Sequence, residues 1–276
     1  MRSVLVTGAS TGIGRATALR LDAGGWRVFA GVRKQEDADA LSQAGSGRVV
    51  PLILDITDSE QIAAAAARVE AEAEGGLDGL VNNAGVAIPG PLETLAIDDF
   101  RRQIEVNMTA HVAVTQALLP AIRTARGRIV FISSIGGRVA IPLTGAYHAA
   151  KFGIEAVGDI FRQELRPWGI AVSIVEPGSI DTPIWERGER TADELASPQR
   201  EALYGKVVAS YRKAIKDTAA RGIPADKAAK AIEHALTARR PRARYLVGRE
   251  AKVAARAKLL LPTPIFDRIV ARQMNL

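Results

Sequence analysis

Short apolar segments alternate with longer helical segments along this chain, and this alternation narrows the possible folds more than any other feature. Seven segments have the pattern of strands, at residues 4–6, 26–32, 49–54, 77–81, 128–133, 170–175 and 244–247. Most are continuously apolar, as is typical of parallel strands buried on both faces. Because crossovers between parallel strands are right-handed, we predict an α/β fold. It would be a single Rossmann-type, doubly wound parallel sheet of about seven strands, with helices on both faces.

Six helices are predicted around these strands, at residues 13–23, 36–44, 58–74, 98–124, 145–166 and 226–238. Pro120 is expected to disturb the last turn of the fourth helix. Residues 178–222 interrupt the alternation, and we expect an irregular insertion there that covers the substrate at the carboxyl edge of the sheet. Residues 1–248 would then form one domain, followed by a basic and apolar C-terminal extension at 249–276.

The composition excludes several kinds of site. The chain has no cysteine, which rules out disulfides, thiolate metal sites and a cysteine nucleophile. Its three histidines are not spaced as metal ligands, so no metal site is predicted. No apolar run approaches the roughly 18 residues of a membrane-spanning helix, and the N-terminal apolar run is too short for a secretory signal. We therefore expect a cytoplasmic protein.

Positive charge is concentrated in the last part of the chain. Residues 221–276 contain thirteen Lys and Arg against four Asp and Glu, within an overall net charge of +7. A solvated basic surface and contact with an anionic membrane are both compatible with this pattern. Aromatic residues do not interleave with the cations, so no nucleic-acid partner is expected.

The extension also carries apolar residues beside its cations. The apolar positions are Leu259, Leu260, Leu261, Ile265, Phe266, Ile269 and Val270, and the flanking cations are Arg256, Lys258, Arg268 and Arg272. We expect this tail to help roof the substrate pocket and treat it as a candidate for peripheral membrane contact. A packed C-terminal extension or a subunit contact is the alternative.

A glycine-rich stretch, residues 7–14, follows the first strand and opens the first helix. Glycines at this position allow a tight turn and a close approach of the backbone to a pyrophosphate at the helix N-terminus. The spacing is G-x-x-x-G-x-G. Although strand-to-helix turns also use glycine for steric reasons alone, the position between first strand and first helix favours a dinucleotide site.

Two cations, Arg33 and Lys34, follow the second strand where a carboxylate would bind a ribose 2′-hydroxyl. Arginine can form a bidentate contact with a 2′-phosphate, so the pattern favours NADP(H) over NAD(H). The alternative is that both cations only solvate the turn. Asp55, after the third strand, is expected either to accept a hydrogen bond from the adenine or to serve as a loop or helix-entry residue.

Tyr147 and Lys151 are four residues apart in a predicted helix and therefore share one face. An ammonium near a phenol lowers the phenol pKa, which would make the tyrosine usable as a general acid or base. Other polar residues fall at or near the carboxyl ends of neighbouring strands. They are Asn82-Asn83-Ala84-Gly85, Asn107 and Ser133-Ser134.

These motifs resemble the classical short-chain dehydrogenase/reductase family across residues 3 to about 183. The resemblance implies a catalytic set of Asn107, Ser134, Tyr147 and Lys151, with Ser133 as the alternative serine. It also implies a cofactor site, completed by the P-G-x-x-x-T segment after the sixth strand. The predicted cofactor residues are Gly8, Ser10, Thr11, Gly12, Ile13, Gly14, Arg33, Lys34, Asp55, Ile56, Asn83, Ala84, Gly85, Tyr147, Lys151, Pro177, Gly178, Ile180 and Thr182.

The implied roles form one reaction. Tyr147 would exchange a proton with the substrate oxygen, Lys151 would bind the nicotinamide ribose, and Ser134 would hydrogen-bond the same substrate oxygen. Asn107 would hold a water linking Lys151 to solvent, and Asn83 would support the backbone beside the cofactor. Hydride would pass between nicotinamide and a carbonyl or alcohol.

Residues 28–34 and 244–248 resemble the hydroxysteroid and retinol dehydrogenase branch, which implies a lipophilic substrate. The family also implies a homodimer or homotetramer. Two other functions are weighed against an active enzyme: a cofactor-binding sensor without turnover, and a nucleic-acid-binding protein that uses the basic tail.

Overall fold

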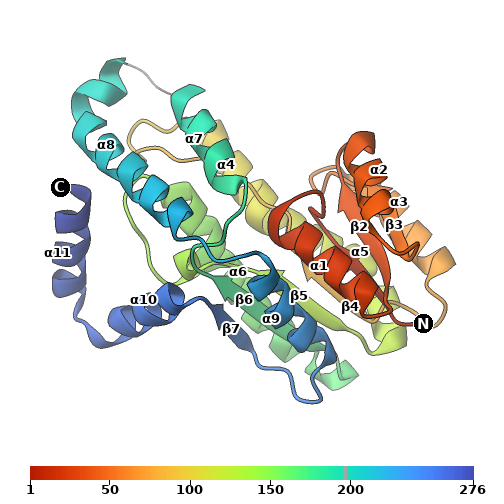
Figure 1. The fold of residues 1–276 in the computed structure, drawn as a ribbon. Helices are drawn as coiled ribbons and strands as arrows, with labels where there is room; N and C mark the ends of the chain where they lie inside the picture. Colours follow the sequence, from red (N-terminus) through yellow and green to blue (C-terminus); the bar gives the residue numbers. More distant parts are fainter. Residues whose placement is uncertain (195–197) are drawn as a thin grey trace.

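A computed structural model describes residues 1–194 and 198–276, apart from some side chains between residues 185 and 220. Its seven strands are β1 Ser3–Val6, β2 Arg27–Val32, β3 Val49–Ile53, β4 Gly79–Asn82, β5 Arg128–Ile132, β6 Ala171–Pro177 and β7 Arg244–Val247. All pairs are parallel, in the order β3-β2-β1-β4-β5-β6-β7 (Figure 1). The predicted doubly wound parallel sheet is therefore confirmed.

Helices cover both faces of the sheet. They are α1 Gly12–Ala23, α2 Gln35–Ala44, α3 Ser59–Glu72, α4 Ile97–Ile104, α5 Ala110–Ala125, α6 Gly145–Glu164, α7 Ile184–Glu194, α8 Pro198–Ala220, α9 Asp226–Thr237, α10 Arg249–Leu260 and α11 Thr263–Met274. Successive side chains of a strand point to opposite faces. Val4 and Val6 accordingly pack in one core with α1, α2 and α9, whereas Leu5 packs in the other with α3, α5 and α6.

The predicted helix at 98–124 is interrupted by a π-helical turn, Glu105–Thr109, between α4 and α5. Such turns insert one extra residue and are frequent at functional sites, and no apolar periodicity announces them. Pro120 lies inside α5, which nevertheless continues to Ala125 and closes on Arg126 in the left-handed conformation.

The prediction that residues 178–222 form an irregular insertion is wrong for most of that segment, because the segment contains the helices α7 and α8. Residues 195–197, between these helices, lie outside the described part. The apolar periodicity that would predict α8 from the sequence is weak, because only a narrow row of its side chains is buried. Val207 and Tyr211, one turn apart, pack with Leu143 and with Met274 of α11. The C-terminal extension thus forms α10 and α11, with α11 alongside α8 (Figure 1).

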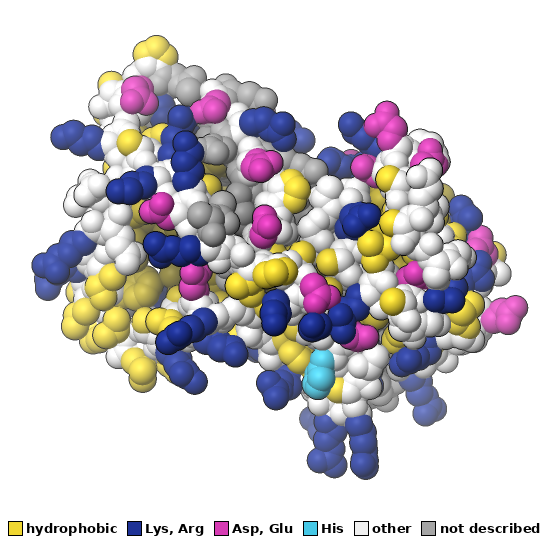
Figure 2. Space-filling view, in the orientation of Figure 1, with side chains coloured by type: hydrophobic (Ala, Val, Ile, Leu, Met, Phe, Trp, Pro, Cys, Tyr) yellow, Lys and Arg dark blue, Asp and Glu magenta, His cyan; other side chains and the backbone are white. Residues whose placement is uncertain are grey.

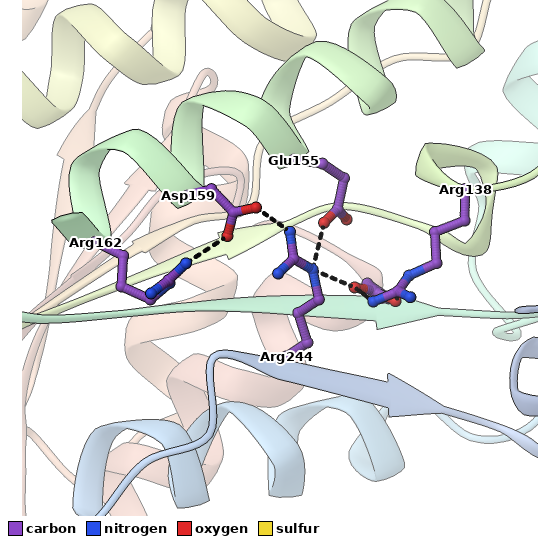
Figure 3. A network of polar contacts seen from close by, with 6 residues as sticks. Arg138, Glu155, Asp159, Arg162 and Arg244 are labelled. Carbon is purple, nitrogen blue, oxygen red and sulfur yellow. Dashed lines mark hydrogen bonds and ion pairs between the residues drawn. The ribbon is translucent and has the colours of Figure 1, made fainter. Parts of the chain in front are cut away.

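A network of ion pairs ties β7 to α6 and to the segment after β5 (Figure 3). The guanidinium of Arg244 lies 3.0 Å from a Glu155 oxygen, 2.6 Å from Asp159 and 3.3 Å from Glu176. Arg138 pairs with the same Glu176 at 2.6 Å. The Glu176 side chain is fully buried, and the two arginines compensate its negative charge.

Among the described residues, no helix is long and apolar enough to cross a bilayer.

Candidate active site

A cavity of about 1200 Å³ opens at the carboxyl edge of the sheet. This is the edge where ligands bind in doubly wound folds. Among the residues predicted for catalysis and cofactor binding, every one lines this cavity except Gly14 and Lys34. The topology therefore brings together residues that are up to 174 positions apart in the sequence, from Gly8 to Thr182.

The turn between β1 and α1 depends on glycine. Gly8 and Gly12 have φ of +63° and +55°, in the left-handed region that favours glycine. A Cβ atom at Gly8 would lie 2.8 Å from the Cα of Ala84, and one at Gly12 would lie 2.9 Å from the Thr182 side chain. The turn thus lies directly against the segments after β4 and β6.

The N-terminus of α1 has no side-chain cap on its first N–H groups. Uncapped N–H groups that face a cavity are suited to a pyrophosphate, so this part of the site fits a dinucleotide. Gly14 has a different role from the one predicted. A Cβ there would lie 2.2 Å from the Gly8 carbonyl oxygen, so Gly14 allows the helix to pack closely on the turn and does not line the cavity.

Asn83 connects the end of β4 to the glycine turn. Its Nδ2 donates to the carbonyl oxygens of Thr7 and Gly8, at 2.9 and 3.1 Å. The Thr7 hydroxyl in return accepts the backbone N–H groups of Asn83 and Ala84. The supporting role expected of Asn83 therefore agrees with the geometry.

At the far end of the nucleotide half, Arg33 and Asp55 both line the cavity. Burial alone would raise the pKa of Asp55. Hydrogen bonds from Thr57, together with the charges of Arg33 and Arg102, lower it overall. The Thr57 contacts show that Asp55 shapes its own turn, and its contact with adenine stays a prediction. Lys34 is exposed and does not line the cavity, so its predicted cofactor contact is not supported.

Tyr147, Lys151 and Ser134 meet in the other half of the cavity. The Lys151 Nζ atom lies 5.7 Å from the centroid of the Tyr147 ring and donates to the Ile132 carbonyl oxygen at 2.8 Å. Ser134 hydrogen-bonds the Tyr147 hydroxyl, while Ser133 is buried beside Glu155. This arrangement favours Ser134 over Ser133 as the serine that faces a substrate.

Burial dominates the electrostatics of the pair. It raises the pKa of Tyr147, an effect that the hydrogen bond with Ser134 only partly opposes. It also lowers the pKa of Lys151 to about 8, against the opposing charge of Glu155. Desolvation of the phenolate therefore outweighs the hydrogen bond from Ser134. The expectation that Lys151 lowers the Tyr147 pKa stays a prediction.

Asn107 lies in the π-helical turn and is fully buried. Its amide makes two hydrogen bonds with the backbone of Val86: Nδ2 donates to the carbonyl oxygen and Oδ1 accepts from the N–H, both at 2.9 Å. Both ends of the side chain are thus used to hold the segment after β4.

Three residues near the site carry no signal in a recognisable motif. Arg102 of α4 lines the cavity, and its charge, like that of Arg33, lowers the pKa of Asp55. His111 donates through Nε2 to the Ala84 carbonyl oxygen at 2.8 Å, and burial lowers its pKa to about 3. His148 follows Tyr147 on α6 and is buried. Only knowledge of which helix faces turn toward the cavity would have identified them.

Apolar residues also line the cavity, namely Val86, Ala87, Ile88, Phe100, Ile104, Pro183 and Ile184. No residue of 249–276 lines it, so the expectation that the tail roofs the pocket is wrong. The tail is instead packed against the structure around the site. Met274 joins the cluster of Leu143 and α8, and Ala251 lies 3.3 Å from the position of a Cβ on Gly178.

Comparison with known proteins agrees with this geometry. Residues 2–193 match the family model described as short chain dehydrogenase. Retinol dehydrogenase 5 of Mus musculus is 40% identical over 97% of this chain and 87% of that protein. The NADPH-dependent 3-dehydrocapnine reductase of Ornithobacterium rhinotracheale is 34% identical over 100% of this chain and 98% of that protein.

Two solved structures are similar along nearly the whole chain. A short-chain dehydrogenase from Streptomyces avermitilis superposes with a TM-score of 0.78 at 31% identity, covering 99% of this chain and 95% of that one. A short chain dehydrogenase from Burkholderia cenocepacia J2315, in complex with NADP, has a TM-score of 0.75 at 29% identity and covers 97% and 98%.

Proposed function

The chain belongs to the short-chain dehydrogenase family and is an oxidoreductase of that family, and from this premise we propose its finer activity. It would use NADP(H) to transfer hydride to or from a lipophilic carbonyl or alcohol. The observation that carries the proposal is that Tyr147, Lys151 and Ser134 share one cavity with a glycine turn suited to a pyrophosphate. A sensor without turnover has no chemical need for this set.

The preference for NADP(H) over NAD(H) is supported by charge. Arg33 directly follows β2, and Arg102 faces the same part of the cavity. An arginine there can form charge-assisted hydrogen bonds with a 2′-phosphate, which NAD(H) lacks. The name of the NADPH-dependent relative and the NADP complex of the similar structure are consistent with this preference.

When bound, the cofactor would supply or accept the hydride at its nicotinamide ring. Tyr147 would donate its phenolic proton to the carbonyl oxygen during reduction and take it back during oxidation. Because burial raises the pKa of Tyr147, the phenol needed for reduction is the form present at neutral pH. Lys151 would stabilise the phenolate left after proton transfer, and Ser134 would orient the substrate oxygen.

Asn107 would act through its backbone. Because its side-chain amide is engaged by Val86, a water linking Lys151 to solvent would have to bind the main chain of the π-helical turn. In that turn the Ala110 N–H bonds to the Glu105 carbonyl oxygen, five residues back. In an ordinary α-helix each N–H bonds to the carbonyl oxygen four residues back, so the hydrogen bonds of the carbonyl groups around Asn107 differ from the α-helical pattern.

A lipophilic substrate is supported by the apolar residues that line the cavity, which include Phe100, Ile104 and Ile184. Such walls favour an apolar ligand that presents one polar group to Tyr147 and Ser134. The names of several relatives point to retinol as one substrate of this class.

The proposal extends to the partners of the protein. Leu259 and Leu260, at the corner between α10 and α11, are 84% and 77% exposed. Hydrophobic side chains gather at this corner of the molecule, next to Lys and Arg (Figure 2). Lys252, Arg256 and Arg268 on the same two helices are also exposed, so this corner would contact an anionic membrane surface. A homodimer or homotetramer is proposed from family membership, and the exposed Phe152 and Ile160 of α6 are consistent with it.

The direct test of this function is turnover with a lipophilic probe. The purified protein is mixed with all-trans-retinal and either NADPH or NADH, and retinol is quantified by chromatography. We expect retinol formation that is faster with NADPH at limiting cofactor. Absence of turnover with retinal and with a panel of steroid ketones would contradict the lipophilic substrate class.

A further inference from the structure

His148 is a buried histidine for which the reaction described above has no use. It follows Tyr147 on α6, and the residue is only 7% exposed. The ring touches two segments that precede α6. Its Nδ1 lies 2.8 Å from the Gly136 carbonyl oxygen, and its Nε2 lies 3.1 Å from the Ile141 backbone nitrogen and 2.9 Å from the Thr144 hydroxyl.

These partners determine the tautomer. A backbone N–H can only donate, so Nε2 must accept from Ile141, and a carbonyl oxygen can only accept, so Nδ1 must carry the proton donated to Gly136. Burial lowers the pKa of His148, in agreement with this neutral form. Every ring nitrogen is therefore satisfied by the backbone of residues 136–144.

Gly136 connects His148 to the catalytic serine. Its backbone N–H donates to the Ser134 Oγ at 3.0 Å, while its carbonyl oxygen accepts from His148. A Cβ at Gly136 would lie 3.0 Å from the His148 Nδ1 and 3.2 Å from the Tyr147 Cε1. The short turn that holds the Ser134 hydroxyl thus lies against both rings.

Ser134 and Tyr147 come from different elements, the end of β5 and the start of α6, and their mutual position depends on contacts between those elements. His148 is on the same helix as Tyr147, and it donates a hydrogen bond to the Gly136 carbonyl oxygen. The N–H of the same Gly136 donates to the Ser134 hydroxyl oxygen. We propose that His148 is a positioning residue that keeps Ser134 in register with Tyr147 through Gly136. It would set the rate of the chemical step without contributing to cofactor binding.

Two amide substitutions separate the two ring contacts. The amide nitrogen of Asn can replace the Nδ1–H donor, and the side-chain oxygen of the longer Gln can replace the Nε2 acceptor. His148→Asn therefore keeps the link to Gly136, His148→Gln keeps the link to Ile141, and His148→Leu removes both. If His148 only fixed the loop at residues 139–144, Gln would be the better replacement.

The kinetic arm rests on the proposed function and measures kcat with NADPH and all-trans-retinal. We expect His148→Asn to stay within about threefold of wild type, because the Ser134 turn is kept. We expect His148→Gln and His148→Leu to lose about 10-fold to 100-fold in kcat, as for a small misplacement of a reacting group. The Kd for NADPH should not change. Equal kcat values for Asn and Gln, or a loss of NADPH binding that parallels kcat, would overturn the proposal.

A second arm needs no substrate and separates the two proposals. NMR of the wild-type imidazole nitrogens should show His148 as the Nδ1–H tautomer, and hydrogen exchange should follow the Gly136 amide. That amide should exchange at least about tenfold faster in the Gln and Leu variants, but not in Asn. An Nε2–H tautomer or unchanged exchange in all variants would refute the role of His148. Absence of turnover in the wild type would refute only the proposed function. Should the Leu variant not fold, the comparison of Asn with Gln decides.

Discussion

The Lys151 ammonium donates a 2.8 Å hydrogen bond to the carbonyl oxygen of Ile132, the last residue of β5. This bond holds the cation at the carboxyl edge of the sheet, 5.7 Å from the Tyr147 ring centroid. The Lys151 side chain is buried, and desolvation lowers its pKa to about 8. Keeping Lys151 charged in the folded protein at neutral pH therefore lowers the free energy of unfolding.

Replacing Lys151 by Met should make the folded protein more stable at pH 7 and inactive. Between pH 8 and about 10.5 the unfolded wild type binds more protons than the folded form, so wild-type stability should rise with pH there. Relative to Lys151→Met, we expect a gain of about 3 kcal/mol between pH 7 and 10.5. Urea denaturation of both proteins at several pH values measures this. A constant difference across that range would show that Lys151 is not destabilised by burial.

The adjacent cations Arg33 and Lys34 offer a matched pair for cofactor specificity. Arg33 lines the cavity and Lys34 does not, although both changes to Asp alter the charge equally. Arg33→Asp should weaken NADPH binding by about 10-fold to 100-fold, the range of a lost charge-assisted bond, and affect NADH much less. Lys34→Asp should have a small effect on either. Fluorescence titration measures the Kd of each variant for NADPH and for NADH. Similar losses of NADPH affinity in both variants would mean that the preference comes from the overall charge and not from a contact made by Arg33.

The buried carboxylates around Arg244 make its replacement costly. Arg244→Met should lower the free energy of unfolding by about 3 kcal/mol, because Glu155 and Glu176 would lose a shared partner. Arg240→Met, at an exposed arginine after α9, should change it by less than about 0.5 kcal/mol. Chemical denaturation compares the two variants. An Arg244 variant as stable as the control would mean that the network contributes no net stability.

Membrane contact is tested at the corner of α10 and α11. Vesicles of phosphatidylcholine and phosphatidylserine should bind the wild type, and binding should weaken with salt. The double variant Leu259→Ser and Leu260→Ser should bind at least about tenfold more weakly, because two exposed leucines no longer enter the interface. Leu203→Ser, at an exposed leucine of α8, is the control. Equal binding of all three proteins would contradict the proposed contact surface.

Much of the fold could be predicted because strand and helix residues alternate with clear periods. The strands are buried on both faces, so their apolar runs stand out, and the turns after them carry glycine, asparagine or serine. By contrast, α7 and α8 were missed. The buried stripe of α8 comes from Val207 and Tyr211, whose partners Leu143 and Met274 lie far away in the sequence.

The site could be predicted where the chemistry requires a residue type at a fixed position in a turn. Tyr147, Lys151 and Ser134 meet this condition, and the structure places them around one cavity. Gly14 and Lys34 do not line it. A motif alone cannot distinguish residues that pack against the turn from residues that contact the cofactor. His148 could not be identified, since its role depends on the backbone of residues 136–144 folding over its helix.

The central claim is that Tyr147 exchanges the proton with the substrate, and Tyr147→Phe tests it most directly. The change removes one hydroxyl and keeps the ring against Gly136 and Lys151. NADPH Kd and retinal reduction are measured on the same preparation. We predict an unchanged Kd and a loss of about 100-fold to 10,000-fold in kcat, the usual contribution of a general acid. A kcat within tenfold of wild type, with NADPH still bound, would contradict the assignment.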